Sequence, residues 1–400
     1  MCSKHRKYQN EQTHLLFCLP EPGPRMINDH LIIDAVAHPY NLDLSNRQDT
    51  ITDERFSGLV EFMYRVGHRP LESKEPGFLM TMQEFQAKWD PWDLCHAFFV
   101  ESDVDVVVPH GVEIAGYAKK GGFSYWPTIM AMKKIAPERV YMYGAVDPFG
   151  HDLSATLADM EEKAAAGCVG YKFYPSNGLF DHECNHQVQL MFSDPTRAYP
   201  LFEKARSLGV KHIAVHKTQP VGVGPLDAVH GEDVSSAAAM FPDLTFEIVH
   251  AGWAFLEETA LQLMVHPNIY ANLEGSAGMV VNQPLQFAHM LGTFLKVCKP
   301  EQLLFASGCA LAHPDPVVRG ILAFQMPQAL VDGYGYPQIT DEMKWGWLGG
   351  NMANLLGIDP QAKLKALAND EWSQMRSHGK AAPWSAYRAR RAGQPMKIKV

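Results

Sequence analysis

Histidine follows three short apolar runs of the sequence. Residues 31–37, 212–215 and 246–249 lead into His38, His216 and His250. A short apolar run is typical of a strand buried on both faces of a parallel sheet. α/β barrels carry their chemistry on residues at the carboxyl ends of such strands. Neutral imidazole is a preferred ligand of first-row metals, so this pattern predicts a metal-dependent enzyme.

Polar residues end the other apolar runs as well. Burying several unpaired imidazoles and a carboxylate would cost about 1–3 kcal/mol each. A bound metal removes that cost, and the mixed donor set suits Fe, Mn or Zn. The polar residues expected at one barrel mouth are His38, His110, Asp147, Lys172, His216, His250, Glu274 and Cys309, followed by His313. The predicted metal ligands are His38, His216, His250, Glu274 and His313.

Three of these residues are candidates for catalysis: Lys172, His250 and Glu274. Lys172 has three interpretations that the sequence leaves open. It fixes an anionic substrate, it is carbamylated and bridges metals, or it pairs with Glu274 or Asp147. Asp34 and Asp315 are expected to fix imidazole tautomers from behind the ligands. The same supporting or substrate-binding role is assigned to His110, Asp147 and Cys309.

The apolar runs alternate with helical patterns along the chain. This order predicts a (β/α)8 TIM barrel over residues 30–360, because the crossovers are long enough for parallel pairing. Residues 39–101 are expected to be an inserted helical lid. Residues 1–29 are expected to be an N-terminal arm. Residues 361–400 are expected to be a basic C-terminal arm that is either solvated or wraps a partner subunit. The predicted strands are 31–37, 104–110, 140–147, 169–175, 212–216, 246–250, 269–274 and 303–309.

Composition excludes several classes of protein. A net charge of -9 argues against a nucleic-acid binder. The sequence holds no run of about 18 apolar residues, and its start lacks the apolar core of a signal peptide. Seven cysteines lie singly without a CxxC pair, as expected in a reducing compartment. These features predict a cytoplasmic enzyme that acts on a small molecule.

The chain resembles the amidohydrolase superfamily, in the branch that contains the aminocarboxymuconate-semialdehyde and resorcylate decarboxylases. The resemblance covers roughly residues 31–360. It implies the barrel fold and a divalent metal at the strand ends. It rests on Ile33-Asp34-Ala35-Val36-Ala37-His38, Gly170-Tyr171-Lys172, His216, His250, Phe305-Ala306-Ser307-Gly308 and Leu348-Gly349-Gly350-Asn351-Met352-Ala353.

Two positions depart from that pattern. Val36 stands where the family usually has a first metal ligand, and Ser307-Gly308-Cys309-Ala310 lacks the usual aspartate that serves as ligand and base. The histidine-rich remainder is similar to the aminoisobutyric acid hydroxylase and related terpenoid hydroxylases. That resemblance implies an oxygen-activating di-iron or manganese–iron centre, a small carboxylate or amino-acid-like substrate, and an electron-transfer partner.

Two other functions stay open at this point. The chain is either a mononuclear metal hydrolase or decarboxylase with a relocated base, or a catalytically silent subunit. The similar hydroxylase is built from two related subunits, so we expect a homo- or hetero-oligomer with a related barrel. Metal content distinguishes the three functions, because they require redox metals, a single zinc, and no metal, respectively.

Overall fold

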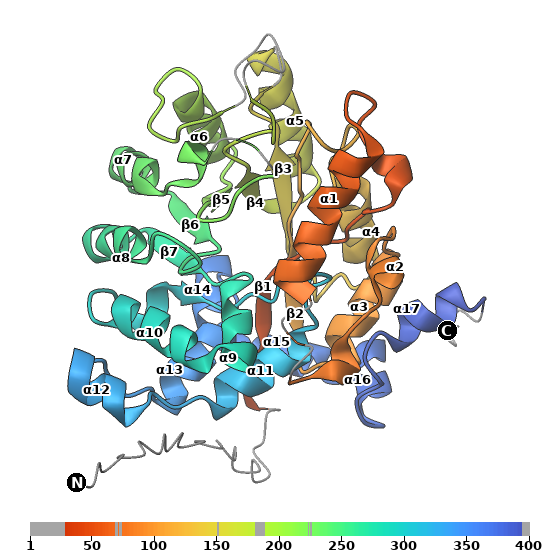
Figure 1. The fold of residues 1–400 in the computed structure, drawn as a ribbon, viewed down its shortest axis with the longest axis vertical. Coiled ribbons are helices and arrows are strands. Elements are labelled where there is room, and N and C mark those ends of the chain that lie inside the picture. Colours follow the sequence, from red (N-terminus) through yellow and green to blue (C-terminus); the bar gives the residue numbers. More distant parts are fainter. Residues whose placement is uncertain are drawn as a thin grey trace, which may run out of the picture.

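The computed structural model describes residues 29–68, 71, 74–149, 152–180, 189–222, 224 and 226–393. The predicted N-terminal arm therefore lies outside the described residues except for Asp29. Figure 1 looks roughly along a ring of strands enclosed by helices. The parallel strands are β1 Ile33–Ala37, β2 Val106–Pro109, β3 Met142–Val146, β4 Cys168–Phe173, β5 His212–His216, β6 Thr245–Val249, β7 Ile269–Asn272 and β8 Leu303–Leu304.

The strands close into a barrel in sequence order. β1 pairs with β2, and β3 to β8 form a continuous six-stranded sheet. Isolated bridges between Val107 and Val140 and between His110 and Tyr143 join β2 to β3. A bridge between Ala37 and Cys309 joins the segment after β8 to β1. The predicted (β/α)8 barrel is confirmed.

The eighth strand is much shorter than the predicted run 303–309. Only Leu303 and Leu304 keep regular strand geometry. Beyond them the side chain of Asp34 accepts hydrogen bonds from the backbone N–H and the hydroxyl of Ser307. Gly308 then adopts a φ of 69°, which favours glycine. Side-chain bonds therefore replace part of the regular ladder between β8 and β1.

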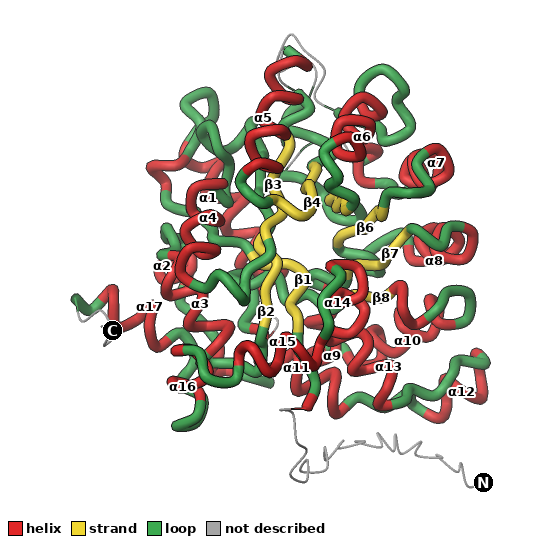
Figure 2. The backbone as a smooth tube through the Cα atoms, turned by 180° about the vertical axis from the view of Figure 1, so that it is seen from behind, coloured by secondary structure: helices red, strands yellow, loops and turns green. Residues whose placement is uncertain are grey.

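Helices cover the outside of the barrel, and further helices lie outside this layer along part of the circumference (Figures 1 and 2). Several begin after a Thr or Asp whose side chain accepts a backbone N–H of the first turn; Asp152 and Asp359 are examples. The helices between strands are α1 Asp53–Met63, α2 Met82–Phe85, α3 Pro91–Phe99, α4 Trp126–Ile135, α5 Leu153–Ala165, α6 Ala198–Ser207, α7 Glu232–Met240, α8 Leu256–Val265, α9 Met279–Asn282 and α10 Pro284–Leu295. Those after β8 are α11 Pro314–Ala323, α12 Gln328–Tyr334, α13 Asp341–Trp345, α14 Asn351–Leu356, α15 Pro360–Leu367, α16 Glu371–Arg376 and α17 Ser385–Arg391.

The described part of the predicted C-terminal arm packs on its own barrel. Trp372 and Trp384 are buried, and the ring of Tyr387 stacks on Trp89 with centroids 4.4 Å apart. These aromatic side chains supply the apolar surface that holds the segment in place. Residues 361–393 are thus a folded part of the molecule and not a solvated tail. Residues 394–400 of the predicted arm lie outside the described residues, and contact of the arm with a partner subunit stays a prediction.

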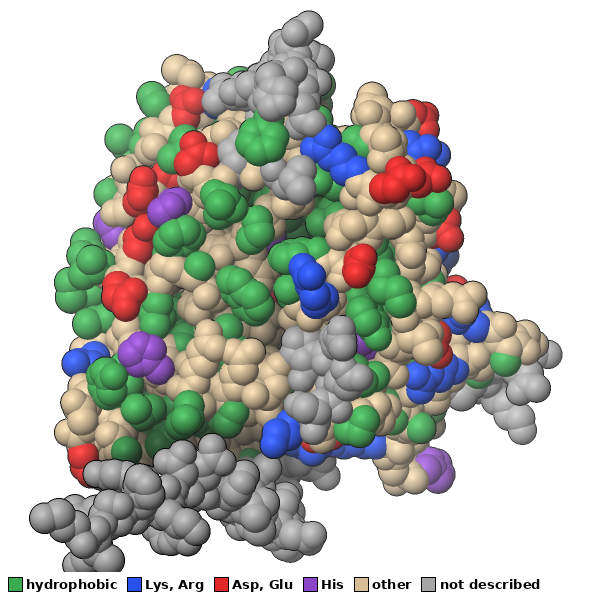
Figure 3. Space-filling model, in the orientation of Figure 1, with side chains coloured by type: hydrophobic (Ala, Val, Ile, Leu, Met, Phe, Trp, Pro, Cys, Tyr) green, Lys and Arg blue, Asp and Glu red, His purple; other side chains and the backbone are tan. Residues whose placement is uncertain are grey.

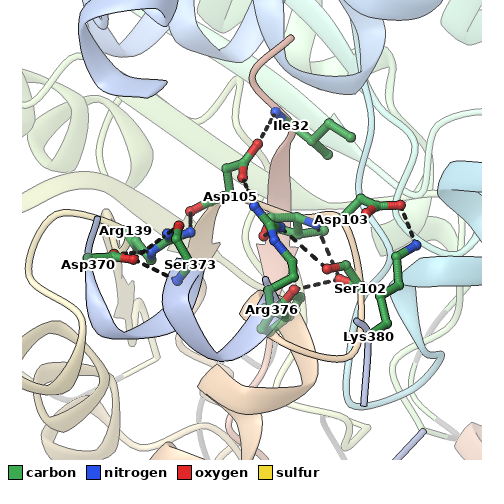
Figure 4. Close-up of polar contacts among 11 residues, drawn as sticks. Ile32, Ser102, Asp103, Asp105, Arg139, Asp370, Ser373, Arg376 and Lys380 are labelled. Atoms are coloured by element: carbon green, nitrogen blue, oxygen red, sulfur yellow. Dashed lines mark hydrogen bonds and ion pairs between the residues drawn. The ribbon is translucent and has the colours of Figure 1, made fainter. Parts of the chain in front are cut away.

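A network of ion pairs attaches α16 to the barrel (Figure 4). Arg139 is buried and binds both carboxylate oxygens of Asp370 at 2.6 and 2.8 Å. It also donates to Ser373 and to the backbone carbonyl of Asp105. Arg376 in turn binds the Asp105 carboxylate at 2.7 Å. Planar two-point pairing of this kind is the strong form of the arginine–carboxylate bond.

Replacing Arg139 with methionine keeps much of its volume but leaves Asp370 and the Asp105 carbonyl without their donor. We expect the free energy of unfolding to fall by about 2 kcal/mol, less than for a fully buried pair because Asp370 keeps some contact with water. Urea unfolding followed by circular dichroism measures this change. Lys363→Met is the control, because its partner Glu138 is exposed and such pairs contribute about 0–1 kcal/mol. Equal losses in the two variants would contradict the prediction.

One outer side of α8 is apolar and exposed. Leu261, Met264 and Val265 follow helical spacing and are each more than half exposed. Figure 3 shows hydrophobic side chains along the edge where α7, α8 and α10 lie. A contiguous exposed apolar surface is more typical of a contact site than single scattered residues are. Within the described residues, none of the helices combines the length and apolar character needed to cross a membrane.

Candidate functional site

His38 and Glu274 meet at the ends of β1 and β7. His38 Nδ1 lies 3.1 Å from the His110 carbonyl, and His38 Nε2 lies 3.0 Å from Glu274 Oε1. Nδ1 faces a carbonyl and must therefore carry the ring proton of the neutral tautomer. Nε2 then presents a lone pair to a carboxylate oxygen, so the contact needs a shared cation, either a proton or a metal ion.

His216 and His250 show the same arrangement at the ends of β5 and β6. Their outer nitrogens face backbone carbonyls, those of Gln219 and Glu274, at 3.1 Å each. Their inner nitrogens, His216 Nδ1 and His250 Nε2, face one another at 2.9 Å. With both outer nitrogens protonated, two lone pairs point into the same space. That geometry is repulsive unless a cation occupies the space, and backbone carbonyls commonly orient ligand histidines in this way.

The backbone at His250 is held in an unusual conformation. Its φ is 67°, a value rare outside glycine. Thr218 also has a positive φ, 62°, and its hydroxyl donates a hydrogen bond to the His250 carbonyl. Such strain costs on the order of 1–3 kcal/mol and is concentrated at functional sites. Here it directs the His250 ring toward His216 and Glu274.

Two imidazoles of this cluster, those of His216 and His250, favour the neutral form. Burial lowers the pKa of His250 to about 4, against the opposing influence of Glu274. Burial also lowers the pKa of His216 far below its usual range, and the neighbouring His250 and Lys172 lower it further. A neutral imidazole has the free lone pair that metal coordination requires. Both histidines are therefore ready to act as ligands near pH 7.

Glu274 is a buried carboxylate in the middle of the cluster. Burial raises its pKa, but His250, His38 and Lys172 outweigh burial and hold the pKa well below its usual range. Glu274 Oε2 has no hydrogen-bond partner among the described residues, and His250 Nε2 lies 3.7 Å away. Gly308 allows this close packing, because an added Cβ would lie 2.8 Å from Glu274 Oε1. Glu274 thus offers a charged, unoccupied oxygen between two imidazoles.

Lys172 is buried, and its Nζ lies 5.4 Å from the centre of the Tyr174 ring, which stacks on His216. The charge of Lys172 contributes to the pKa shifts of His110, His216, His250 and Glu274. Burial lowers the pKa of Lys172 to about 8, although nearby carboxylates oppose the change. None of the described residues accepts a hydrogen bond from Lys172 Nζ. The predicted salt bridge to Glu274 or Asp147 is therefore not formed as a direct contact.

A deeper carboxylate, Glu247 on β6, supports the cluster from inside the barrel. It accepts hydrogen bonds from the Tyr143 hydroxyl at 2.6 Å and from Asn272 Nδ2 at 2.9 Å. Burial raises the pKa of Glu247, while the bonds from Tyr143 and Asn272 and the charge of Lys172 oppose the rise. Both hydrogen bonds hold Glu247 below the strand ends.

Two tyrosines that the sequence reasoning missed stand over the cluster. The Tyr40 ring lies against His38, with centroids 4.9 Å apart, and the Tyr174 ring stacks on His216 at 4.8 Å. Burial, together with nearby Glu274, raises both hydroxyl pKa values, so both stay protonated donors. Each follows a singled-out residue by two positions, and this spacing on an extended chain was the available signal.

The structure does not bring His313 into this cluster. Its Nε2 lies 3.3 Å from Glu101, and its Nδ1 accepts the backbone N–H of Asp315. Its ring packs on Phe78 and Trp384. These partners are not members of the strand-end cluster, so His313 is not a ligand candidate in this structure. The residue is the N-cap of α11, and its side chain accepts a backbone N–H of the first turn.

The expected supporting residues have other partners. Asp34 bonds Ser307 rather than an imidazole, and burial raises its pKa to about 7. Asp315 pairs with Arg319 and Lys380, so neither aspartate fixes a ligand tautomer; backbone carbonyls do so instead. Asp147 accepts the N–H of Phe149 in its own loop. Cys309 is buried, and burial raises its thiol pKa far above the usual range, which argues against a reactive thiolate.

A second group of possible ligands lies on the outside of the barrel. His230, Glu232 and Glu258 place one ligand atom each within 4.8 Å of the others, and among the described residues no other group does so. The strand-end residues instead form a chain of contacts from His38 through Glu274 and His250 to His216. Glu232 is largely exposed, whereas the strand-end group is buried. Burial and the facing lone pairs favour the strand-end group as the metal centre.

Comparison with known proteins identifies the family. The sequence model described as amidohydrolase matches residues 95–358, well over half of the chain. This chain belongs to the amidohydrolase family. Enzymes of the family are metal-dependent, as the sequence predicted. A search of curated protein sequences finds no match.

Solved structures resemble this amidohydrolase at low sequence identity. An uncharacterised TIM-barrel protein from Bordetella bronchiseptica is 17% identical, with a TM-score of 0.57 over 84% of this chain and 99% of the other. A 4-oxalomesaconate hydratase from Rhodopseudomonas palustris is 17% identical, with a TM-score of 0.46 over 84% and 97%. A 5-carboxyvanillate decarboxylase from Sphingomonas paucimobilis is 14% identical, with a TM-score of 0.45 over 82% and 99%. The likeness to the Bordetella bronchiseptica protein establishes the fold alone. The TM-scores of the hydratase and the decarboxylase are too low to support any further conclusion.

The residues present fit a metal ion of the kind that the family uses. The facing nitrogens of His216 and His250 and the contact of His38 with Glu274 each call for a cation. Glu274 supplies the negative charge, and its free Oε2 is a further ligand atom. Val36 and Ala310 occupy two of the sites where the amidohydrolase resemblance placed ligands, and neither side chain can bind a metal ion.

Proposed function

We propose that this amidohydrolase is an oxygen-activating hydroxylase, with its metal held by His38, His216, His250 and Glu274. The observation that carries the proposal is the donor set: three imidazoles and one carboxylate meet at four strand ends. Histidines with a single carboxylate and open positions are typical of non-haem iron oxygenases. When bound, iron or manganese would supply the redox chemistry that no protein side chain provides.

Among the described residues, no carboxylate lies at the end of β8, where the family resemblance places the base, and this argues against ordinary hydrolysis. The segment Ser307-Gly308-Cys309-Ala310 carries no carboxylate, and Ser307 is engaged with Asp34. Glu274 is enclosed by His38 and His250, while Glu247 is held below them by Tyr143 and Asn272. A hydrolytic or decarboxylating enzyme would need one of these groups to exchange protons with the substrate. In this proposal Glu247 is fixed by its two hydrogen bonds, and Glu274, whose Oε2 has no partner among the described residues, serves as a metal ligand instead of a base.

The protein's own residues have defined tasks in this proposal. Backbone carbonyls orient the three imidazoles, and Gly308 lets the chain pack closely against Glu274. Tyr40 and Tyr174 cover the cluster and limit the access of water. The hydroxylase proposal also requires an electron donor, and we propose that a separate protein supplies it. The exposed apolar side of α8 supports a further proposal, association with another barrel subunit.

Metal analysis combined with oxygen consumption tests the proposal. We expect the purified protein to retain iron or manganese, and to consume oxygen only when a chemical reductant is supplied. A His216→Ala variant is expected to lose both the metal and the reductant-dependent oxygen uptake. Zinc alone with no oxygen uptake would overturn the proposal in favour of a hydrolase or decarboxylase. A stable metal-free chain that becomes active only with a related subunit would make it the silent partner.

A further inference from the structure

The alternation of side chains along β6 points His250 toward the outer face of the barrel wall. Phe246 faces outward, because its ring packs against Phe202 of α6 with centroids 5.5 Å apart. Glu247 faces inward, where it accepts the hydroxyl of Tyr143 from β3. Successive side chains of a strand point to opposite faces. A regular continuation of β6 would therefore send the side chain of residue 250 outward, on the same face as Phe246.

His216 reaches the barrel mouth without such a conflict. It is paired with Val249 in the parallel sheet, and paired residues of neighbouring strands face the same side. His216 thus shares the inward direction of Val249. His250 nevertheless meets it, with Nε2 2.9 Å from His216 Nδ1. The strand must therefore break at His250 itself, and the left-handed φ of 67° is where the alternation ends.

Thr218 shares this unusual backbone and contacts His250. Its φ is 62°, and among the described residues only four that are not glycine have a positive φ. Such a value is a clear outlier for a β-branched residue, and glycine or asparagine adopts it more easily. The hydroxyl of Thr218 donates to the His250 carbonyl at 2.5 Å, and the backbone N–H of Trp253 donates to the same carbonyl at 3.0 Å. Threonine at this position thus supplies a bond that glycine could not.

The segment that carries Thr218 is anchored to the following helix. The backbone N–H of Thr218 donates to the Val229 carbonyl at 2.8 Å. The buried ammonium of Lys217 binds Asp233, on α7, at 2.9 Å and the Ala228 carbonyl at 2.9 Å. Thr218 is itself buried. Its hydroxyl is therefore held by a fixed backbone and in turn fixes the carbonyl that it binds.

We propose that Thr218 is a positioning residue of the metal centre, because its hydroxyl holds His250 in the left-handed conformation that turns the imidazole toward His216. The inference rests on the metal site of the proposed function, but not on hydroxylase chemistry. Without the hydroxyl, the His250 carbonyl keeps only the bond from Trp253. The imidazole then has to be ordered when the metal binds, and this ordering lowers the affinity.

Cobalt(II) titration of the full, metal-stripped chain tests this role. A competing chelator measures the affinity, and the visible absorption of the bound cobalt reports the arrangement of its ligands. We expect Thr218→Gly to lower the affinity about 10–100-fold, as the loss of groups that orient metal ligands does, and to change the spectrum. Thr218→Ser keeps the hydroxyl, so it should retain the affinity and the spectrum of the unaltered protein.

Stability separates positioning from a merely structural role. Urea unfolding of metal-free Thr218→Gly should resemble that of the unaltered chain, because glycine relieves the backbone strain and this offsets the lost hydrogen bond. Thr218→Val keeps the branched side chain without the hydroxyl, so it should lose both stability and cobalt affinity. Thr259→Val is the matched control, because the buried Thr259 hydroxyl also donates to a backbone carbonyl, that of Phe255, at 3.0 Å. Its cobalt affinity should equal that of the unaltered protein.

Several results would overturn the inference. They are an unchanged cobalt affinity in Thr218→Gly, an equal loss of affinity in Thr218→Ser, and an equal loss in Thr259→Val. A Thr218→Gly chain that loses affinity and also unfolds at much lower urea would show that Thr218 is only structural. The proposed function fails separately. Zinc content without oxygen uptake would refute the hydroxylase and leave the role of Thr218 intact, whereas oxygen uptake with unchanged affinity in Thr218→Gly would do the reverse.

Discussion

Replacing Glu274 with glutamine is expected to abolish metal retention. The variant keeps the shape of the side chain but removes the one negative charge that faces His38 and His250. Loss of a residue that merely supports a ligand costs about 10–100-fold in metal affinity, so loss of this carboxylate should cost at least ~100-fold. Elemental analysis after dialysis measures the metal content, and competition with a chelator measures the affinity.

Glu258→Gln is the matched control for that experiment. Glu258 belongs to the outer group with His230 and Glu232, whose ligand atoms are the most closely gathered of the described residues. If the metal centre lies at the strand ends, Glu258→Gln retains full metal content. Loss of metal in the control together with retention in Glu274→Gln would move the centre to the outside of the barrel. Thermal unfolding of both variants confirms that each chain is folded.

Glu101→Gln is expected to cause the largest loss of stability. This buried carboxylate accepts hydrogen bonds from His96, His313, the backbone N–H of Trp384 and the Ser385 hydroxyl. It thereby joins the start of α11 to the C-terminal segment. An amide would turn a donor toward other donors and remove the charge that they share. Breaking a buried network of this kind costs about 3–5 kcal/mol. Urea unfolding measures the loss.

The same carboxylate predicts a pH dependence. Burial raises its pKa, but the bonds from His313 and His96 outweigh burial and lower it from 4.5 to about 2. A lowered pKa means that the stabilisation is complete above pH 4.5 and is lost as the pH falls toward 2. The stabilisation that is lost over this pH range is on the order of 3 kcal/mol. The unaltered protein should therefore lose stability over this range more steeply than Glu101→Gln does.

Glu84→Gln provides the control for Glu101. Glu84 also holds the C-terminal segment, through Arg388, but both side chains are partly exposed. Pairs of that kind contribute about 0–1 kcal/mol. A loss below 1 kcal/mol in Glu101→Gln, equal to that of Glu84→Gln, would show that the buried network contributes little. The packing of Trp384 against Trp89 and His313 would then be what holds the segment.

The sequence by itself determined the barrel and most of its mouth. A strand buried on both faces must be a continuous apolar run, so β1, β5 and β6 were visible locally, and the residue that ends such a run must lie at the mouth. His38, His216, His250, Glu274 and Lys172 could therefore be placed together before any coordinates were known. This inference used only the two-residue period of a strand and the parallel order of the barrel.

Tertiary structure alone decided the rest. His313, four residues beyond the last predicted strand, follows a loop rather than a strand, so its direction depends on Glu101, 212 positions away in the sequence. The burial of Trp384 depends on contacts between the chain's end and its first quarter. The unsatisfied nitrogens of Lys172 and His110 are visible only once every neighbour is placed. Local periodicity fixes which residues reach the mouth, whereas hydrogen-bond partners depend on packing between distant segments.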